Sequence, residues 1–527
     1  MWKLPPMLVP VLLSIAITKL YGASWTEEFS LANTAYDAGD YGSAEKHDRA
    51  ALTAAESFGA NDLRLEATLT HLGAVVQARG VCCDGESLAR RALAIREINF
   101  GKNSFEVALG KNNLASIWQQ AGRTKEAQQL QAEALALAER ALKPGSTQLI
   151  PFLTLAALTE RDAAHYDKAV DLLKRARDLA ERDVTANPRY VMQIKRYLAS
   201  VYRFADKFDD AQSTYKELIL LSESKYGADS LDTATALANL GSLLCQHQFY
   251  TEALPYLSRA SSTFERIHET DLPSYSATLQ NMSLAEVSLG QGHSAEQHAL
   301  SAVRILKAQK VVDAQSLAVA ENNLGQVYVT QGRYKEAREA TMQAFQVWLD
   351  TTGHDSTKTA AAISNLGALY VRMHKYKKAE AYYAEAIDID RRVLGESSVA
   401  YARDLNRLGV LQNERRHFPE AEGVLRRALE IEGKKLETRS PILAESYLNI
   451  GLSLQGQHRN DEALDYYRRG IDLMANAGQK GTPKMAVVLQ QYSLLLRAMQ
   501  RWSEAEQAST ESLGIIVHEK AKGESYQ

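Results

Sequence analysis

Apolar residues recur along most of this chain with the three-and-four spacing of a helix that buries one face. Around Gly325 the apolar positions of one such face are Leu317, Ala320, Leu324, Val327 and Tyr328. The polar stretch Gln331-Gly332-Arg333 interrupts this pattern, and the same spacing resumes from Ala337. The pattern therefore predicts a first helix and a second helix joined by a short turn.

The same helix pair recurs with a period of 42 residues, which we follow through one small residue per unit, called the anchor. The anchors are Ala32, Gly73, Ala115, Ala157, Ala199, Gly241, Ser283, Gly325, Gly367, Gly409, Gly451 and Ser493. A second small residue stands twelve positions after each anchor, and it is alanine in every unit except the one with Gly85. Two small residues at this spacing allow the paired helices to approach closely. Because one helix pair cannot bury its apolar face alone, we expect the units to stack into a continuous array.

The two ends of the chain depart from the repeat. Residues 1–24 carry Lys3, an apolar run and then small residues at Gly22-Ala23-Ser24, a pattern that is typical of a secretory signal peptide. The alternative is a membrane-held or merely apolar N-terminus. We therefore expect an exported protein, periplasmic or secreted, with the repeat array over residues 25–520 and a polar tail over residues 521–527.

Several units carry a set of residues that resembles a known family. Asn323-Leu324-Gly325 followed by Tyr334 and Ala337 looks like the tetratricopeptide repeat. The period and the string Asn112-Asn113-Leu114-Ala115 resemble the kinesin light chain-like branch of that family. This resemblance implies an all-α fold, a right-handed α-solenoid of about twelve helix-turn-helix units. It also implies that the first helices line a concave groove that receives peptides or proteins.

Asparagine recurs two residues before the anchor, about 200° around the helix from it and so away from the helix–helix contact. The six are Asn113, Asn239, Asn281, Asn323, Asn365 and Asn449. An asparagine amide both donates and accepts, so it can pair with the backbone of an extended peptide. The resemblance implies the same role, since asparagines at this place contact peptide in peptide-binding members. The alternative is that each asparagine bonds to the neighbouring repeat and stiffens the stack.

The same helical face continues seven residues further along the chain. We add Gln120, Gln246 and Arg372 to the candidate groove residues on this ground. Arg372 could pair with a carboxylate. The sequence offers no matching set of basic residues beside the asparagines, so recognition of a C-terminal carboxylate is not expected.

Charge and composition exclude several kinds of partner. The 61 basic and 64 acidic side chains leave a net charge of −3, which gives no electrostatic basis for nucleic-acid binding. After the N-terminal segment no stretch is long and apolar enough for a membrane span. We therefore expect protein or peptide partners and no integral membrane segment in the mature chain.

The sequence contains no recognisable catalytic motif. His268-Glu269 and His518-Glu519 lack a second histidine four residues on, as a zinc-protease motif would require. Cys82, Cys83 and Cys245 do not have metal-ligand spacing, and each is either packed or a free thiol. We therefore expect no catalytic site, no metal and no cofactor.

Two classes of function fit these observations. The first is a non-catalytic scaffold or adaptor that binds extended segments or protein partners in the groove. The second is a ligand-responsive regulator or sensor of an exported complex, whose coil tightens around a peptide or small molecule. A compactness change on adding ligand would distinguish the second from the first, and a cryptic hydrolase is the remaining alternative.

Overall fold

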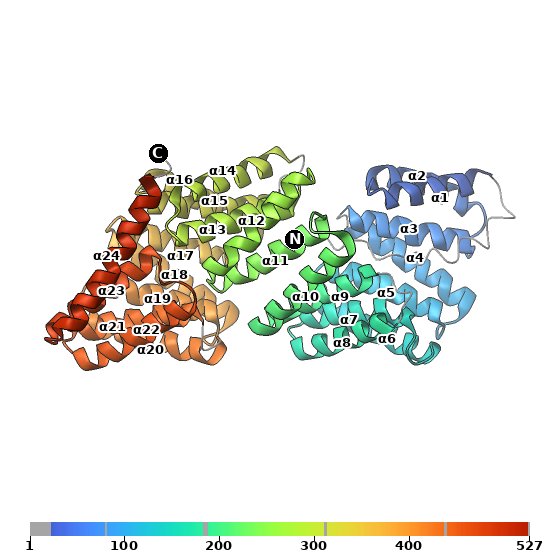
Figure 1. Cartoon of the computed structure of the whole chain (residues 1–527). Coiled ribbons are helices and arrows are strands. Elements are labelled where there is room, and N and C mark those ends of the chain that lie inside the picture. The colour runs from blue at the N-terminus through green and yellow to red at the C-terminus, as the bar shows by residue number, and fades with distance from the viewer. Residues whose placement is uncertain (1–22, 80–81, 183–187, 310–312, 437–439, 525–527) are drawn as a thin grey trace. The chain divides into compact units, whose positions relative to one another are not determined.

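The computed structural model describes residues 23–79, 82–182, 188–309, 313–436 and 440–524 (Figure 1). The predicted signal peptide lies outside the described residues except for Ala23 and Ser24, which begin the first helix. The next residue, Trp25, is already part of the buried core, and its indole N–H donates to Thr68 Oγ1 at 3.0 Å.

The described residues form helices α1 to α24 and one short 3₁₀ helix, without strands, and they divide into two compact units at Thr214/Tyr215. The first unit contains α1 Ala23–Asp37, α2 Tyr41–Glu56, α3 Leu63–Ala78, α4 Cys82–Phe100, α5 Phe105–Gln120, α6 Thr124–Ala141, η2 Thr147–Leu149, α7 Ile150–Asp162, α8 Tyr166–Arg182 and α9 Pro188–Phe204. Helix α10, Phe208–Tyr226, spans the boundary.

The second unit, called unit 2 below, holds seven further helix pairs. They are α11 Leu231–Gln246, α12 Tyr250–Arg266, α13 Pro273–Ser288, α14 Gly292–Ala308, α15 Ala314–Thr330, α16 Tyr334–Thr352, α17 Thr357–Arg372, α18 Tyr376–Leu394, α19 Val399–Glu414, α20 Phe418–Lys435, α21 Pro441–Gly456, α22 Asn460–Asn476, α23 Pro483–Ala498 and α24 Trp502–Glu524. Odd-numbered helices are the predicted first helices and even-numbered helices the second. The last helix continues past the predicted start of the polar tail at residue 521.

The anchors lie where the sequence pattern predicts a close helix–helix contact. A Cβ atom on Gly409 would stand 2.4 Å from a Leu425 side-chain carbon, and one on Gly241 equally close to Leu257. Serine replaces glycine at two anchors, and there its hydroxyl donates to the second helix instead. Ser283 Oγ, for example, lies 2.8 Å from the carbonyl oxygen of Ala295, the small residue twelve positions on.

The alanines twelve positions after the anchors are sealed inside each pair. All eleven are between 0% and 1% exposed. A larger residue at this place has no room, because the backbone of the first helix faces it directly.

We expect Ala337→Leu to lower the free energy of unfolding by about 1–3 kcal/mol through overpacking. Ala337 is fully buried, and its carbonyl oxygen lies only 3.3 Å from the place where Gly325 would carry a Cβ atom. Glu339→Leu, on the exposed side of the same helix, is the matched control and should change little. Urea unfolding followed by circular dichroism measures both, and equal stability of the two variants would contradict the predicted register.

Both kinds of turn between helices use backbone with positive φ. Seven positions after the anchor, the turn inside the pair has positive φ in glycines such as Gly332 and in larger residues such as His374 and Arg416. At the end of a second helix, Gly353 has φ 77° and ψ 175°, and Gly395 has φ 82° and ψ 164°. Backbone with positive φ and ψ near 180°, as at Gly353 and Gly395, is essentially reserved for glycine. A glycine thus ends the second helix there, with a backbone more extended than in an ordinary left-handed cap.

Candidate functional site

The first helices of unit 2 lie on the inner side of the curve that the repeats describe. Each first helix contacts the next first helix, from α11 with α13 through α21 with α23. Among the described residues, consecutive second helices make no comparable contact. Helices on the inside of a curve approach one another more closely than those outside, so the first helices form the inner face of unit 2.

The candidate asparagines of unit 2 lie on this inner face, one per helix. Asn239 and Gln246 come from α11, Asn281 from α13, Asn323 from α15, Asn365 and Arg372 from α17, and Asn449 from α21. Helix α19 interrupts the series, because Arg407 occupies the equivalent place. Asn113 and Gln120 lie on α5, in the first unit.

Three consecutive repeats use the asparagine position to bond to the repeat before. Asn365 Nδ2 donates to Asn322 Oδ1 at 3.0 Å, and Asn449 Nδ2 donates to Asn406 Oδ1 at 2.7 Å. Between them, Arg407 donates to Ser364 Oγ at 2.5 Å. In each case the acceptor stands three residues before the anchor of the preceding repeat. These bonds correspond to the alternative stated in the sequence analysis, in which the asparagine bonds to the neighbouring repeat and stiffens the stack.

The asparagines nearer the start of unit 2 are arranged differently. The residue that could accept from Asn281 in the preceding repeat is Ala238, which has no side-chain acceptor. Within the described residues the half-buried side chains of Asn281 and Asn323 have no hydrogen-bond partner. Their donors and acceptors are therefore available to a ligand. Asn239, on α11, is buried and only 8% exposed.

The helical stripe that carries the asparagines also exposes apolar side chains. Positions six before and one after the anchor share this stripe, since residues three and four apart are neighbours on a helix surface. Val319 on α15 is 41% exposed, and Val487 and Leu494 on α23 are 58% and 49% exposed. Gln246 and Arg372 are exposed as well. The inner face thus offers amides beside apolar groups. Sequence alone does not single out these apolar positions, because it does not distinguish an exposed apolar side chain on a helix from a buried one.

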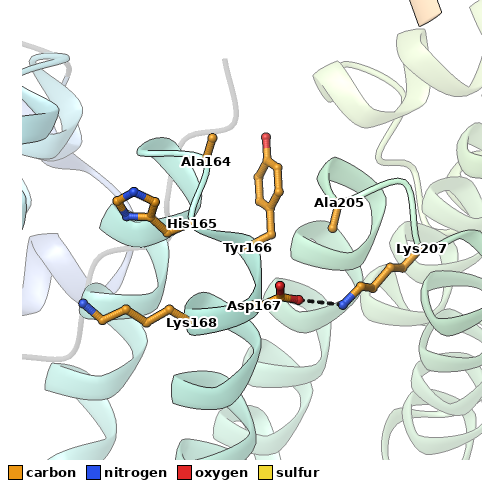
Figure 2. A pocket seen from close by; sticks show the side chains of 7 residues that line it. All are labelled: Ala164, His165, Tyr166, Asp167, Lys168, Ala205 and Lys207. Carbon is orange, nitrogen blue, oxygen red and sulfur yellow. Dashed lines mark hydrogen bonds and ion pairs between the residues drawn. The ribbon is translucent and has the colours of Figure 1, made fainter. Parts of the chain in front are cut away.

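A separate hollow of about 310 Å³ opens at the surface of the first unit, between the α7–α8 turn and the α9–α10 turn (Figure 2). Asp167 Oδ1 and Lys207 Nζ form an ion pair across it at 2.8 Å. His165 Nδ1 lies 2.8 Å from Glu160, which also pairs with Lys168. Figure 2 shows the Tyr166 ring between His165 and Lys207, with its hydroxyl pointing away from Asp167. The charged groups neutralise one another, and no lining residue is a serine, threonine or cysteine nucleophile.

The described part of the chain contains neither a metal-binding cluster nor a helix suited to a membrane. No group of three or more histidine, cysteine, aspartate or glutamate residues in this part of the chain could hold a metal ion. None of the described helices combines the length and the apolar character needed to cross a bilayer. The thiol of Cys245 is free and buried, and this burial raises its pKa to about 12.

The helix pairs, their 42-residue register and the small residues at each contact define an all-α solenoid of repeated hairpins. The tetratricopeptide repeat model matches residues 106–182, 190–249, 237–308, 316–392, 359–432 and 442–516. These segments cover well over half of the chain, so the chain belongs to the tetratricopeptide repeat family. The resemblance predicted from Asn323-Leu324-Gly325 is thereby confirmed.

Comparisons with individual proteins give weaker likenesses. No curated protein matches the chain. Among solved structures, BtubC from P. vanneervenii has 22% identity and a TM-score of 0.34, over 43% of this chain and 91% of that one. A Rap protein complexed with competence and sporulation factor has 15% identity and a TM-score of 0.49, over 71% and 99%. The APC/C hetero-tetramer Cut9–Hcn1 has 13% identity and a TM-score of 0.37, over 94% of each chain.

Proposed function

We propose that this protein is a non-catalytic scaffold that binds an extended peptide segment along the inner face of unit 2. The observation that carries the proposal is the pair of half-buried amides, Asn281 and Asn323, on adjacent inner helices and without an internal partner. An amide of this kind can donate to a backbone carbonyl and accept from a backbone N–H of a peptide. Such contacts give affinity for any extended backbone.

Selectivity would come from the side chains around the amides. Val319 lies one helical turn from Asn323 on the same stripe and is exposed, so it can receive an apolar side chain of the ligand. Arg372, two helices further, can pair with an acidic one. The absence of a converging nucleophile, base and acid among the described candidate residues supports the non-catalytic part of the proposal.

The proposal also includes the export predicted from residues 1–24, which would place the partner outside the cytoplasm. The support for this part is the pattern of Lys3, the apolar run and the small residues that follow.

Selection from a library of random linear peptides tests the function directly. The full chain should retain a set of peptides, and binding of a retained peptide should slow amide hydrogen exchange in α13 and α15, because those helices would be covered. Exchange should stay unchanged in the second helices α14 and α16 away from the inner face. Failure to retain any peptide, or protection confined to the second helices, would contradict the proposed inner-face site.

A further inference from the structure

The row of repeats in unit 2 returns to its own beginning. Thr251 Oγ1, at the start of α12, donates to the carbonyl oxygen of Gly478 at 3.2 Å, although the two residues are 227 positions apart in the chain. Gln479 Nε2 donates to the carbonyl oxygen of Gln248 at 3.2 Å. We call these four residues, Gln248, Thr251, Gly478 and Gln479, the seam. The seam joins the α11–α12 end of the row to the loop between α22 and α23.

The seam is a small and polar contact. Beside it lies a hollow of about 240 Å³ lined by seam residues and by Tyr250, Ser288, Leu289, Glu445, Thr482 and Lys484. Glu445 and Lys484 form an ion pair beside this hollow at 3.5 Å, with their side chains 41% and 45% exposed. Two neutral hydrogen bonds and one partly exposed ion pair, beside a hollow, make a contact that is much weaker than a repeat–repeat interface.

Closure of the seam changes how a ligand reaches the inner face. The first helices form an unbroken row from α11 to α23, each in contact with the next, and the seam joins the turn that follows α11 and the start of α12 to the loop that precedes α23. The asparagine stripe faces the inside of this closed row, where Val319, Val487 and Leu494 remain open to solvent. A segment bound there is encircled by the chain. It must enter by its end, or the seam must open.

We propose that the seam is a latch, and that the partner of the inner face is a free chain terminus which threads in while the latch is closed. This inference rests on the proposed function, because it concerns the route by which a peptide reaches the same stripe. A loop held at both ends by a folded protein cannot thread through a closed row. Such a loop binds only while the seam is open.

A disulfide across the seam tests whether it closes. A Cβ atom on Gly478 would lie 3.7 Å from Thr251 Cβ, which is within the range of disulfide-bonded cysteines. We therefore expect Thr251→Cys with Gly478→Cys, in a chain with Cys82→Ser and Cys83→Ser, to form an intramolecular disulfide in air. Cys245 should not compete, since it is 3% exposed. Each single substitution is the control and should give no intramolecular crosslink. A folded double variant that stays reduced would overturn the closed seam.

The latch itself is tested with one selected linear peptide in two forms. One form has a free end, and the other joins two copies of a small folded protein so that neither end is free. In the oxidised variant we expect the free-ended peptide to bind and the blocked form to associate about tenfold more slowly or not at all. Dithiothreitol should restore the blocked form. A second variant, Thr251→Ala with Gln479→Ala in an otherwise unmodified chain, removes both seam hydrogen bonds and leaves Gly478 in place. The blocked form should associate faster with this variant than with the parent chain.

The outcomes separate the latch from the proposed function. Equal association of the two peptide forms with the oxidised variant would overturn the latch, even where both depend on Asn281 and Asn323. Unchanged association of the blocked form in the Thr251→Ala, Gln479→Ala variant would overturn it as well. If replacing Asn281 and Asn323 leaves peptide binding to the reduced chain unchanged, the proposed inner-face site is rejected instead.

Discussion

Replacing Asn281 and Asn323 together by alanine is expected to weaken binding of a selected linear peptide by about tenfold or more, with little change in the free energy of unfolding. The two side chains have no internal partner among the described residues, so their removal leaves no buried group unsatisfied. Each amide that pairs with a peptide backbone loses two hydrogen bonds on truncation. Isothermal titration calorimetry of the peptide and urea unfolding of the free chain measure the two quantities.

The matched control is the pair Asn365→Ala and Asn449→Ala, at the same repeat position. These amides donate to Asn322 and Asn406, and Asn406 is only 7% exposed. Their removal strands the acceptors, which costs about 1–3 kcal/mol of unfolding free energy for a buried group. We expect this pair to lose stability and to affect peptide affinity less. If the first pair destabilises the chain instead and leaves affinity intact, all the asparagines are structural and the assigned site is wrong.

Two carboxyl groups buried between repeats are expected to reduce the unfolding free energy of unit 2 as pH rises from about 4 to about 7. Asp390 on α18 is 1% exposed, and Glu432 on α20 is fully buried. They occupy the same place in consecutive repeats, where the neighbouring repeats have Trp348 and Met474. Burial raises the pKa of Asp390 to about 6, with the nearby Asp404 adding to the rise against Arg403 and Arg407. Burial raises the pKa of Glu432 to about 7, despite the bond from Ser446 Oγ at 2.6 Å.

The sign follows from which state holds the proton. Below about pH 4 both carboxyls are protonated in the native and unfolded chain, and the contribution of these two sites to stability is greatest. As pH rises, the unfolded chain releases its protons first, so the native state loses its advantage until it too ionises near pH 6 to 7. Above that range the loss is complete. Each site contributes about 3 kcal/mol on this basis, since one pKa unit corresponds to about 1.4 kcal/mol.

Glu432→Gln tests this prediction, because glutamine keeps the shape and removes the charge. The variant should be more stable than the parent at pH 8 by up to about 3 kcal/mol and nearly equal to it at pH 4. Glu430→Gln on the same helix is the control. That carboxyl is exposed and pairs with Arg427 and Lys434 at 2.9 Å and 2.7 Å, which lowers its pKa. A Glu432→Gln variant whose stability relative to the parent does not change from pH 4 to pH 8, or that is less stable than the parent at pH 8, would show that the native state accommodates the charge.

The repeat pattern alone could not predict which asparagines bond to the preceding repeat and which have no internal partner. All six share one position, yet the fate of each depends on a residue 43 positions earlier, in a neighbouring helix. Asn365 meets Asn322, an acceptor, whereas Asn281 meets Ala238. The doublet Asn322-Asn323 was visible in the sequence, but which member of it bonds across the repeats depends on how adjacent helices cross.

The sequence by itself determined the elements of this protein and their contacts within a repeat. The 42-residue period located the helix pairs, and Gly409 and Ala421 or Gly325 and Ala337 lie at the close contacts they predicted. Such local features follow from helical periodicity and side-chain size, which a single unit already contains. Only the tertiary structure showed the seam between Thr251 and Gly478, the burial of Asp390 and Glu432, and which amides remain unpaired. These properties depend on the small rotation between successive repeats, which accumulates over the whole array and leaves no mark in any one unit.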